Sequence, residues 1–347
     1  MKHLASCWIG LLLCAVAPFT QAANTWTVTS TGGGGVCTAN SITDPNCTLD
    51  AAIYTAANGD TVVFAPSIQG QTICGTYPNA TYQNTPPSVT IDGSPNGVVL
   101  DSCGSGPLFA LDSGNVTFSH LTLQNSPSVA IYDTGANVTV DSCTFKGNSA
   151  SGGAPSGGAI AQVGGAVLIV DSTFTNNSAS SNGGAIAAYG NVTISNSTIT
   201  GNHAANGGGV GGYGITIMSS IVAGNTASTS SPDIYIFASA ASLGYNLVGN
   251  SSGSGLAATT GDQFDVNPLF ATAGLANNGG ATQTVALQSL SPARAGGNCA
   301  GNDGSNGYAV IPALTLDQRG YARTSPGAIG CTVGALDMTS IFYNGFE

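Results

Sequence analysis

The stretch VTISNSTITGN, residues 192–202, decides the fold that this sequence predicts. Apolar residues occupy its first and third positions with Thr between them, and this alternation is typical of a half-buried β-strand. A small polar pair follows, and a second short strand and a closing Gly-Asn complete the stretch. The sequence therefore predicts a strand, a corner, a second strand and a turn in quick succession.

The same pattern recurs along the middle of the chain. Four other stretches align with it without gaps, and successive copies start 22 to 29 residues apart: VTFSHLTLQNS (116–126), VTVDSCTFKGN (138–148), VLIVDSTFTNN (167–177) and ITIMSSIVAGN (215–225). A third apolar piece precedes later copies, at 158–160, 184–186 and 208–210. Asn closes four of the five copies, and we expect it to adopt the left-handed backbone of a tight turn.

Three short strands per repeat predict an all-β fold, a right-handed parallel β-helix or solenoid. Coils would stack about 4.8 Å apart, with like residues on like residues. The right hand is the default for parallel crossovers. The alternation also predicts two outward-facing Thr columns, Thr117, Thr139, Thr193 and Thr216 on the first strand and Thr122, Thr144, Thr173 and Thr198 on the second.

An open β-helix must protect its ends. Residues 48–58 have the pattern of a short amphipathic helix, with Thr48 as the N-cap, Asp50 in the first turn and Gly59 as the stop. A strand follows at 61–64. We expect this helix to close the N-terminal end of the core.

Residues 1–23 have the pattern of a secretory signal peptide, with a basic start, an apolar run and small residues at the end. Without them the chain has four basic residues against 16 acidic ones, a net charge of −12. Such a surface repels nucleic acid and anionic membranes. No later segment is long and apolar enough to span a bilayer. We therefore expect a secreted or cell-surface protein.

Seven cysteines remain after removal of the signal peptide, and in an exported protein they indicate disulfides. Pairing between sequence neighbours gives Cys37–Cys47, Cys74–Cys103 and Cys299–Cys331, although the sequence alone leaves other connectivities open. Cys143 is left over at an inward-facing site where other copies carry Leu or Ser, so a buried thiol is favoured over a reactive one. No metal site is expected, because His is scarce and no Cys-x-x-Cys is present.

Both ends of the mature chain carry motifs that resemble those of secreted bacterial proteins. Residues 47–53 and 58–64 resemble the CSLREA motif, but Asp50-Ala51 stands where that motif has Arg-Glu. The C-terminal third resembles the choice-of-anchor Q domain in its segments 242–248, 265–269, 277–284, 291–293 and 317–320. These resemblances imply a pectin-lyase-like β-helix at the cell surface or outside the cell, and they imply no particular activity.

The expected organisation has five parts: a signal peptide (1–23), an N-terminal cap with the first strands (24–88), regular coils (89–235), the choice-of-anchor Q-like segment (236–338) and a tail (339–347).

Catalytic chemistry has few candidates in this chain. A glycosidase needs two carboxyl groups about 5–10 Å apart, and Asp141 and Asp171 on neighbouring coils are the best pair. A lyase needs a base and positive charge, and Lys146 is the only Lys of the mature chain. Both Asp residues could instead be corner residues that bond the backbone, which is the favoured interpretation. Arg319 is expected to form a structural ion pair with Asp317.

The leading hypothesis is a secreted or cell-surface β-helix protein that is adhesin-like or binds carbohydrate, with a polysaccharide or cell-surface glycan as its partner. The alternative is an extracellular polysaccharide lyase or glycoside hydrolase that acts in a groove on the coil face. In that alternative Asp141, Asp171 and Lys146 would carry the chemistry. No cofactor is expected, although the number of Asp residues allows a Ca²⁺ site.

Overall fold

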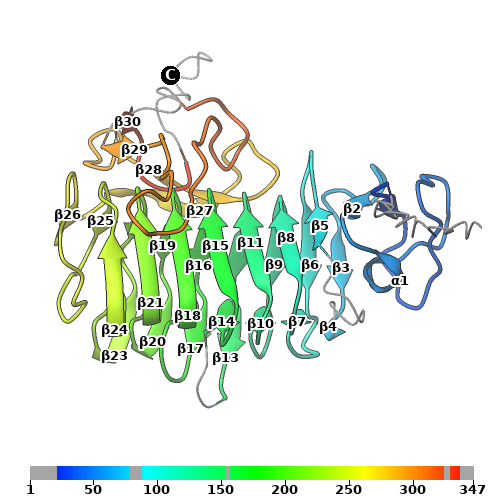
Figure 1. Ribbon diagram of the computed structural model, residues 1–347, viewed down its shortest axis with the longest axis horizontal. Helices are drawn as coiled ribbons and strands as arrows, with labels where there is room; N and C mark the ends of the chain where they lie inside the picture. The colour runs from blue at the N-terminus through cyan, green and yellow to red at the C-terminus, as the bar shows by residue number, and fades with distance from the viewer. Residues whose placement is uncertain (1–21, 79–87, 153–156, 295, 324–328, 337–347) are drawn as a thin grey trace, which may run out of the picture.

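The structure is a computed structural model, and it describes residues 22–78, 88–152, 157–294, 296–323 and 329–336. It is an all-β right-handed parallel β-helix of about seven turns, along one side of which the C-terminal segment packs (Figure 1). Almost all of the expected signal peptide and the tail lie outside the described residues. Within the described part, no helix has both the length and the apolar character needed to cross a membrane.

Two long parallel sheets form the walls of the helix. The 13-stranded sheet contains β1 (Thr25–Val28), β2 (Thr61–Phe64), β4 (Tyr77–Pro78), β5 (Ser88–Asp92), β7 (Phe109–Leu111), β8 (Asn115–Ser119), β10 (Ile131–Asp133), β11 (Asn137–Asp141), β14 (Ile160–Gln162), β15 (Ala166–Val170), β18 (Ile186–Ser195), β21 (Val210–Met218) and β24 (Ile234–Ser242). The nine-stranded sheet contains β3 (Thr72–Cys74), β6 (Val98–Asp101), β9 (Leu121–Gln124), β12 (Thr144–Lys146), β16 (Thr173–Thr175), β19 (Thr198–Thr200), β22 (Ile221–Val222), β25 (Leu247–Val248) and β26 (Gln263–Phe264).

Three smaller sheets complete the described part. A four-stranded parallel sheet contains β13 (Ser149–Ala150), β17 (Ser178–Ala179), β20 (His203–Asn206) and β23 (Thr226–Ser230). Two antiparallel pairs belong to the C-terminal segment, β27 (Phe270–Ala276) with β28 (Thr284–Leu287) and β29 (Gly297–Asn298) with β30 (Ile329–Cys331).

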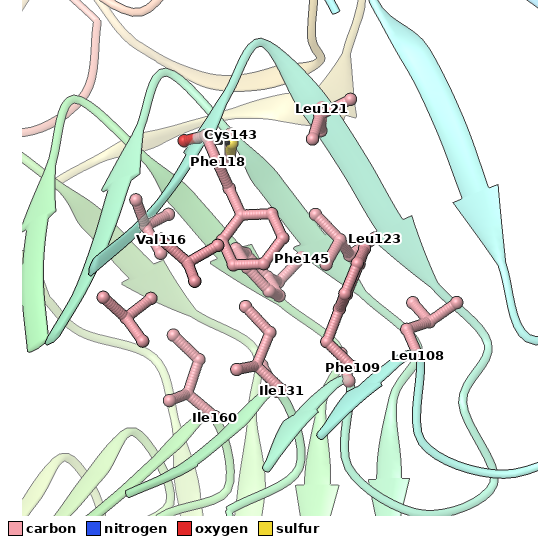
Figure 2. Close-up of a cluster of buried hydrophobic side chains, with 14 of the residues drawn as sticks. Leu108, Phe109, Val116, Phe118, Leu121, Leu123, Ile131, Cys143, Phe145 and Ile160 are labelled. Carbon is pink, nitrogen blue, oxygen red and sulfur yellow. Dashed lines mark hydrogen bonds between the residues drawn. The ribbon is translucent and has the colours of Figure 1, made fainter. Parts of the chain in front are cut away.

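The repeat alignment is confirmed by the strand register. Val138 pairs with Val116 on one side and Val167 on the other, and Phe145 lies between Leu123 and Phe174. These side chains fill the space between the sheets (Figure 2). The third apolar piece of each coil lies in the same sheet as the first strand, and from β18 onward a β-bulge joins the two into one continuous strand.

The expected role of the closing Asn was wrong. The left-handed residue is the one before it, for example Gly147 (φ 67°) and Gly201 (φ 69°). The closing Asn residues are instead buried and form a ladder along the core, in which each side-chain amide donates to the next: Asn148 to Asn177, Asn177 to Asn202, Asn202 to Asn225, each at 2.9 Å, and Asn225 to Asp233 at 2.8 Å. Burial selects Asn here because an amide both donates and accepts.

The N-terminal end is closed by a helix, as predicted, but the helix α1 (Leu49–Thr55) is shorter than expected. Its apolar face buries Leu49, Ala52 and Ile53 against the first strands. Thr48 occupies the N-cap position without capping, because its hydroxyl accepts a hydrogen bond from the Gly35 amide at 3.1 Å.

The predicted disulfides and the predicted Asp317–Arg319 ion pair are both present in the structure. The structure contains all three expected disulfides, and Cys143 is a buried free cysteine. Arg319 forms the expected ion pair with Asp317, with its Nε 2.9 Å from the carboxylate. The coils continue past residue 235 through β24, β25 and β26, where the repeat signature fades although the pairing persists.

Candidate functional site

The expected groove around Asp171 is not open. Asp171 is 4% exposed, and its carboxylate binds the guanidinium of Arg323, which comes from the C-terminal segment and is 1% exposed. Burial raises the pKa of Asp171, while the charge of Arg323 opposes this rise. The backbone of Asp171 is left-handed (φ 44°), as at the equivalent Asn196 (φ 46°). Asp171 is thus a corner residue that anchors the segment.

Gln318 explains why the outward Thr column of the nine-stranded sheet is covered. Its side-chain amide donates to the carbonyl of Cys143 at 3.0 Å and to the hydroxyl of Thr144 at 3.1 Å. Its carbonyl accepts from Thr173 at 2.6 Å. Both Thr side chains are fully buried as a result. The column faces outward from the core, as predicted, and the C-terminal segment covers it, because alternation fixes which residues point outward but not what packs on them.

Lys146 and Asp141 take no part in the buried ion pair, although the charge of Asp141 contributes to the raised pKa of Asp171. The Lys146 ammonium donates to Gln283 Oε1 at 2.8 Å, again in the C-terminal segment. Asp141 is half-buried and accepts from the hydroxyl of Ser142 at 2.9 Å. The roles of Lys146 and Asp141 in catalysis stay predictions.

A histidine and a carboxylate that the sequence did not bring together meet at the same corner of the helix. His120 Nδ1 lies 2.9 Å from Asp92 Oδ1, and this hydrogen bond raises the pKa of His120, with a further contribution from the charge of Asp141. Alignment of the β5 and β8 stretches could have predicted this contact, because their register places Asp92 beside Ser119, the residue before His120.

A groove of about 530 Å³ crosses the outer face of the 13-stranded sheet. Its floor comes from four neighbouring strands, β11, β15, β18 and β21, and one wall is the loop at 307–309. The described residues that line it are Asn137, Val138, Thr139, Ala166, Val167, Leu168, Asn191, Thr193, Thr216, Gly307, Tyr308 and Ala309. None of these residues carries a charge.

The polar groups of the groove occupy two register positions, although not on every coil. Thr139, Thr193 and Thr216 occupy one register position, with Leu168 between them, and Asn137 and Asn191 occupy another. Coils stack about 4.8 Å apart, so Thr193 and Thr216 are near neighbours, whereas Ala166 and Leu168 of β15 interrupt both polar rows. The side chain of Tyr308 is 44% exposed and adds an aromatic ring beside these rows.

Four aromatic rings gather on the same sheet, next to the groove. Tyr213 and Phe237 stack with centroids 4.8 Å apart, and Tyr189 lies 5.5 Å from Tyr213. Tyr235 meets Phe237 edge-on at 4.9 Å. Tyr189 immediately precedes the stretch that supplies Asn191 to the groove, and Tyr213 is 43% exposed. The aromatic cluster thus shares β18 and β21 with the groove and extends onto β24, which does not line the groove.

A second hollow, of about 590 Å³, contains two carboxyl groups, those of Asp233 and Asp265. Burial raises the pKa of Asp233 to about 6, but its oxygens already accept hydrogen bonds from Asn225 and from the Asn250 amide. Asp265 accepts from Ser251. Both carboxylates already accept hydrogen bonds from backbone amides and neighbouring side chains, Asp233 at the end of the Asn ladder. This hollow therefore does not present a free acid–base pair.

A metal centre finds no support in the described part of the chain, where no three His, Cys, Asp or Glu residues are grouped as ligands. Residues 107–268 match the family model described as right handed beta helix region. The matched residues and the observed coils together support a right-handed β-helix protein. No curated protein matches the chain. Three disulfides in one chain favour an extracellular location.

Proposed function

We propose that this is an exported β-helix protein that binds a neutral polysaccharide along the groove of the 13-stranded sheet. The observation that carries the proposal is the uncharged lining of the groove, in which three of the four strands, β11, β18 and β21, supply Thr or Asn side chains. Hydroxyl and amide groups can exchange hydrogen bonds with sugar hydroxyls, and a Tyr ring can pack against the apolar face of a sugar. A linear chain that crosses the coils would meet the Asn and Thr side chains of β11 at one end of the groove and those of β18 and β21 at the other, with the apolar Leu168 between them.

Charge explains why the proposal names a neutral ligand. An acidic polysaccharide needs cations, but Lys146, Arg319 and Arg323 are each held by a partner outside the groove. The mature chain is also strongly acidic, which repels a polyanion. The aromatic cluster beside the groove favours a carbohydrate over a peptide with many charges.

Affinity electrophoresis in gels that contain single polysaccharides tests the proposal. We expect neutral glucans, mannans or galactans to retard the protein and polygalacturonate or alginate to leave it unaffected. Thr139→Val and Thr216→Val remove groove hydroxyls and should each weaken binding about two- to tenfold. Thr117→Val is the matched control, because Thr117 pairs with Thr139 in register but lies outside the groove. Preference for acidic polymers, or an equal loss in the control, would contradict the proposal.

Cleavage of the bound glycan is a second candidate, favoured by the His120–Asp92 pair beside Asp141. An imidazole held by one carboxylate can move a proton, and a second carboxylate could assist. Assays for new reducing ends and for unsaturated products would detect hydrolysis or elimination. Activity lost in Asp141→Asn and kept in the exposed control Asp112→Asn would support cleavage, whereas no product with any bound glycan would reject it.

A further inference from the structure

The outer edge of β24 is an unpaired strand edge within the described part of the chain. β24 (Ile234–Ser242) pairs with β21 on one side and with no described strand on the other, and it ends the row of long arrows in Figure 1. Its nine residues, IYIFASAAS, include no charged residue and no Pro. Natural edge strands are usually blunted by Lys, Pro, bulges or short length. This edge has one bulge, and at its C-terminal end the Ser242 carbonyl accepts a hydrogen bond from the Thr259 hydroxyl at 3.3 Å.

The hydrophobic core is also incompletely covered at this end. In interior coils the inward-facing Ala188 and Val192 are 0% and 1% exposed. Their counterparts at the end of the same columns, Ile236 and Ala240, are only partly buried. Leu256 from the following loop packs on this end and is 8% exposed. Apolar surface and an unpaired backbone edge therefore coincide.

The opposite end of the helix is closed. The helix α1 packs on β1 and β2 and buries Leu49 and Ala52 there, and the disulfide Cys37–Cys47 ties the preceding loop to it. Figure 1 shows α1 towards one end of the long axis and β24 towards the other, with β26 and the yellow loop before it beyond β24. The molecule thus has one end that can accept another strand and one that cannot.

We infer that the partner of β24 is a second copy of this chain, joined end to end by antiparallel pairing of the two β24 strands about a two-fold axis. A two-fold contact places the same edge on both sides, so each copy satisfies the other's backbone groups and covers its exposed apolar residues. Because α1 closes the far ends, association stops at the dimer and no fibre can grow. β24 and the adjoining stretch 250–261 carry no charge, and the charge that contacts β24 is that of Asp262, which accepts a hydrogen bond from the Ser242 hydroxyl at the C-terminal end of the strand.

The net negative charge of each copy opposes this association over longer distances. Salt screens such repulsion without weakening backbone pairing. We therefore expect the dimer to be stronger at 0.5 M than at 0.05 M NaCl, which is opposite to the behaviour of a contact held by surface ion pairs.

Sedimentation velocity and light scattering of the mature, oxidised protein test the inference, with hydrogen exchange of β24 as an independent readout. The wild type should have twice the monomer mass at micromolar concentration, and its β24 amides should lose protection on dilution. Ala238→Lys places a charge at an exposed edge position and should weaken the dimer about tenfold or more. Ala166→Lys makes the same change at an exposed position of the interior strand β15 and should leave the dimer intact.

Two kinds of result would contradict a dimer formed through β24. A wild type that stays monomeric across the concentration range overturns the inference, and protected β24 amides in that monomer would show another segment on the edge. A dimer that persists unchanged in Ala238→Lys, or that both Lys variants weaken equally, places the interface elsewhere and also overturns it. Circular dichroism of each variant confirms that the coils are folded.

Discussion

The ion pair between Asp171 and Arg323 should hold the C-terminal segment on the coils, and Asp171→Asn tests this most directly. Asn fits the site without new backbone strain, because it tolerates the left-handed conformation and occurs naturally at the equivalent corner, Asn196. The change leaves Arg323 buried at 1% exposure without its counter-charge. Arg323 retains carbonyl partners, those of Leu316 at 3.0 Å and Thr332 at 3.4 Å, but these neutralise no charge.

Removal of one member of a buried ion pair typically costs about 3–5 kcal/mol. Arginine cannot shed its proton in a protein, so Asp171→Asn should reach that range. Arg323→Met should cost less, because Asp171 already has a raised pKa and can become neutral by binding a proton. The double variant Asp171→Asn/Arg323→Met contains no unpaired charge and should be about 2 kcal/mol more stable than Asp171→Asn alone.

Urea unfolding of the oxidised protein, followed by circular dichroism, measures these differences. With an m-value of about 3 kcal/mol/M, a loss of 3 kcal/mol lowers the midpoint by about 1 M. Hydrogen exchange around Thr173 and Gln318 detects release of the segment before the coils unfold. Asp141→Asn is the control and should change stability by less than about 0.5 kcal/mol, since Asp141 is half-buried and its hydrogen bond from the Ser142 hydroxyl can equally be accepted by an amide oxygen. A cost below about 1 kcal/mol for Asp171→Asn, or simple additivity in the double variant, would refute the reasoning.

Three other predictions concern buried polar groups. Gln318→Leu should cost about 1–3 kcal/mol because it strips partners from Thr173 and the Cys143 carbonyl, while Gln288→Leu on the exposed surface should cost little; urea midpoints compare them. The Cys143 thiol should resist iodoacetamide in the folded protein and react after unfolding, since it is fully buried and burial raises its pKa; labelling of the native protein would contradict this. Burial raises the pKa of Asp133 from 3.8 to about 6, so the folded state binds its proton more tightly than the unfolded state. The contribution of this proton to the free energy of unfolding is present in full below about pH 4 and is lost, by about 3 kcal/mol, as the pH rises through 6. Asp133→Asn should remove this part of the pH dependence, which urea midpoints at pH 4 and pH 7 measure.

The coil itself could be predicted from sequence because its rules are local. Alternation assigns Val138 and Val140 to the interior, and repetition then fixes the register with the neighbouring coils. The disulfides were predictable for a similar reason, since each joins cysteines only 10 to 32 residues apart. The Asp317–Arg319 ion pair could be predicted for the same reason, because its members are only two residues apart in the sequence.

Contacts between distant segments were not predictable in this way. Arg323 meets Asp171 across 152 residues, and Gln318 meets Cys143 across 175. No periodicity connects these positions, because the C-terminal segment has no repeat of its own. The sequence held one clue to the ion pair. Arg is rarely buried without a partner, so an Arg in a segment that packs on the coils predicts a carboxylate near it. Which acid it finds depends on how the segment folds back.

The two outward Thr columns show how one local pattern takes two roles. Both follow from the same alternation, and stacked Thr suits a β-sheet surface whatever lies above it. On the nine-stranded sheet the C-terminal segment covers the column, and Thr144 and Thr173 satisfy buried amides and carbonyls. On the 13-stranded sheet Thr139 and Thr216 stay partly exposed on the floor of the groove, while Thr193 between them is buried. The same hydroxyls that bind the chain's own Gln318 on one face are therefore available on the other for the hydroxyls of a sugar, which is the physical basis for placing the glycan there.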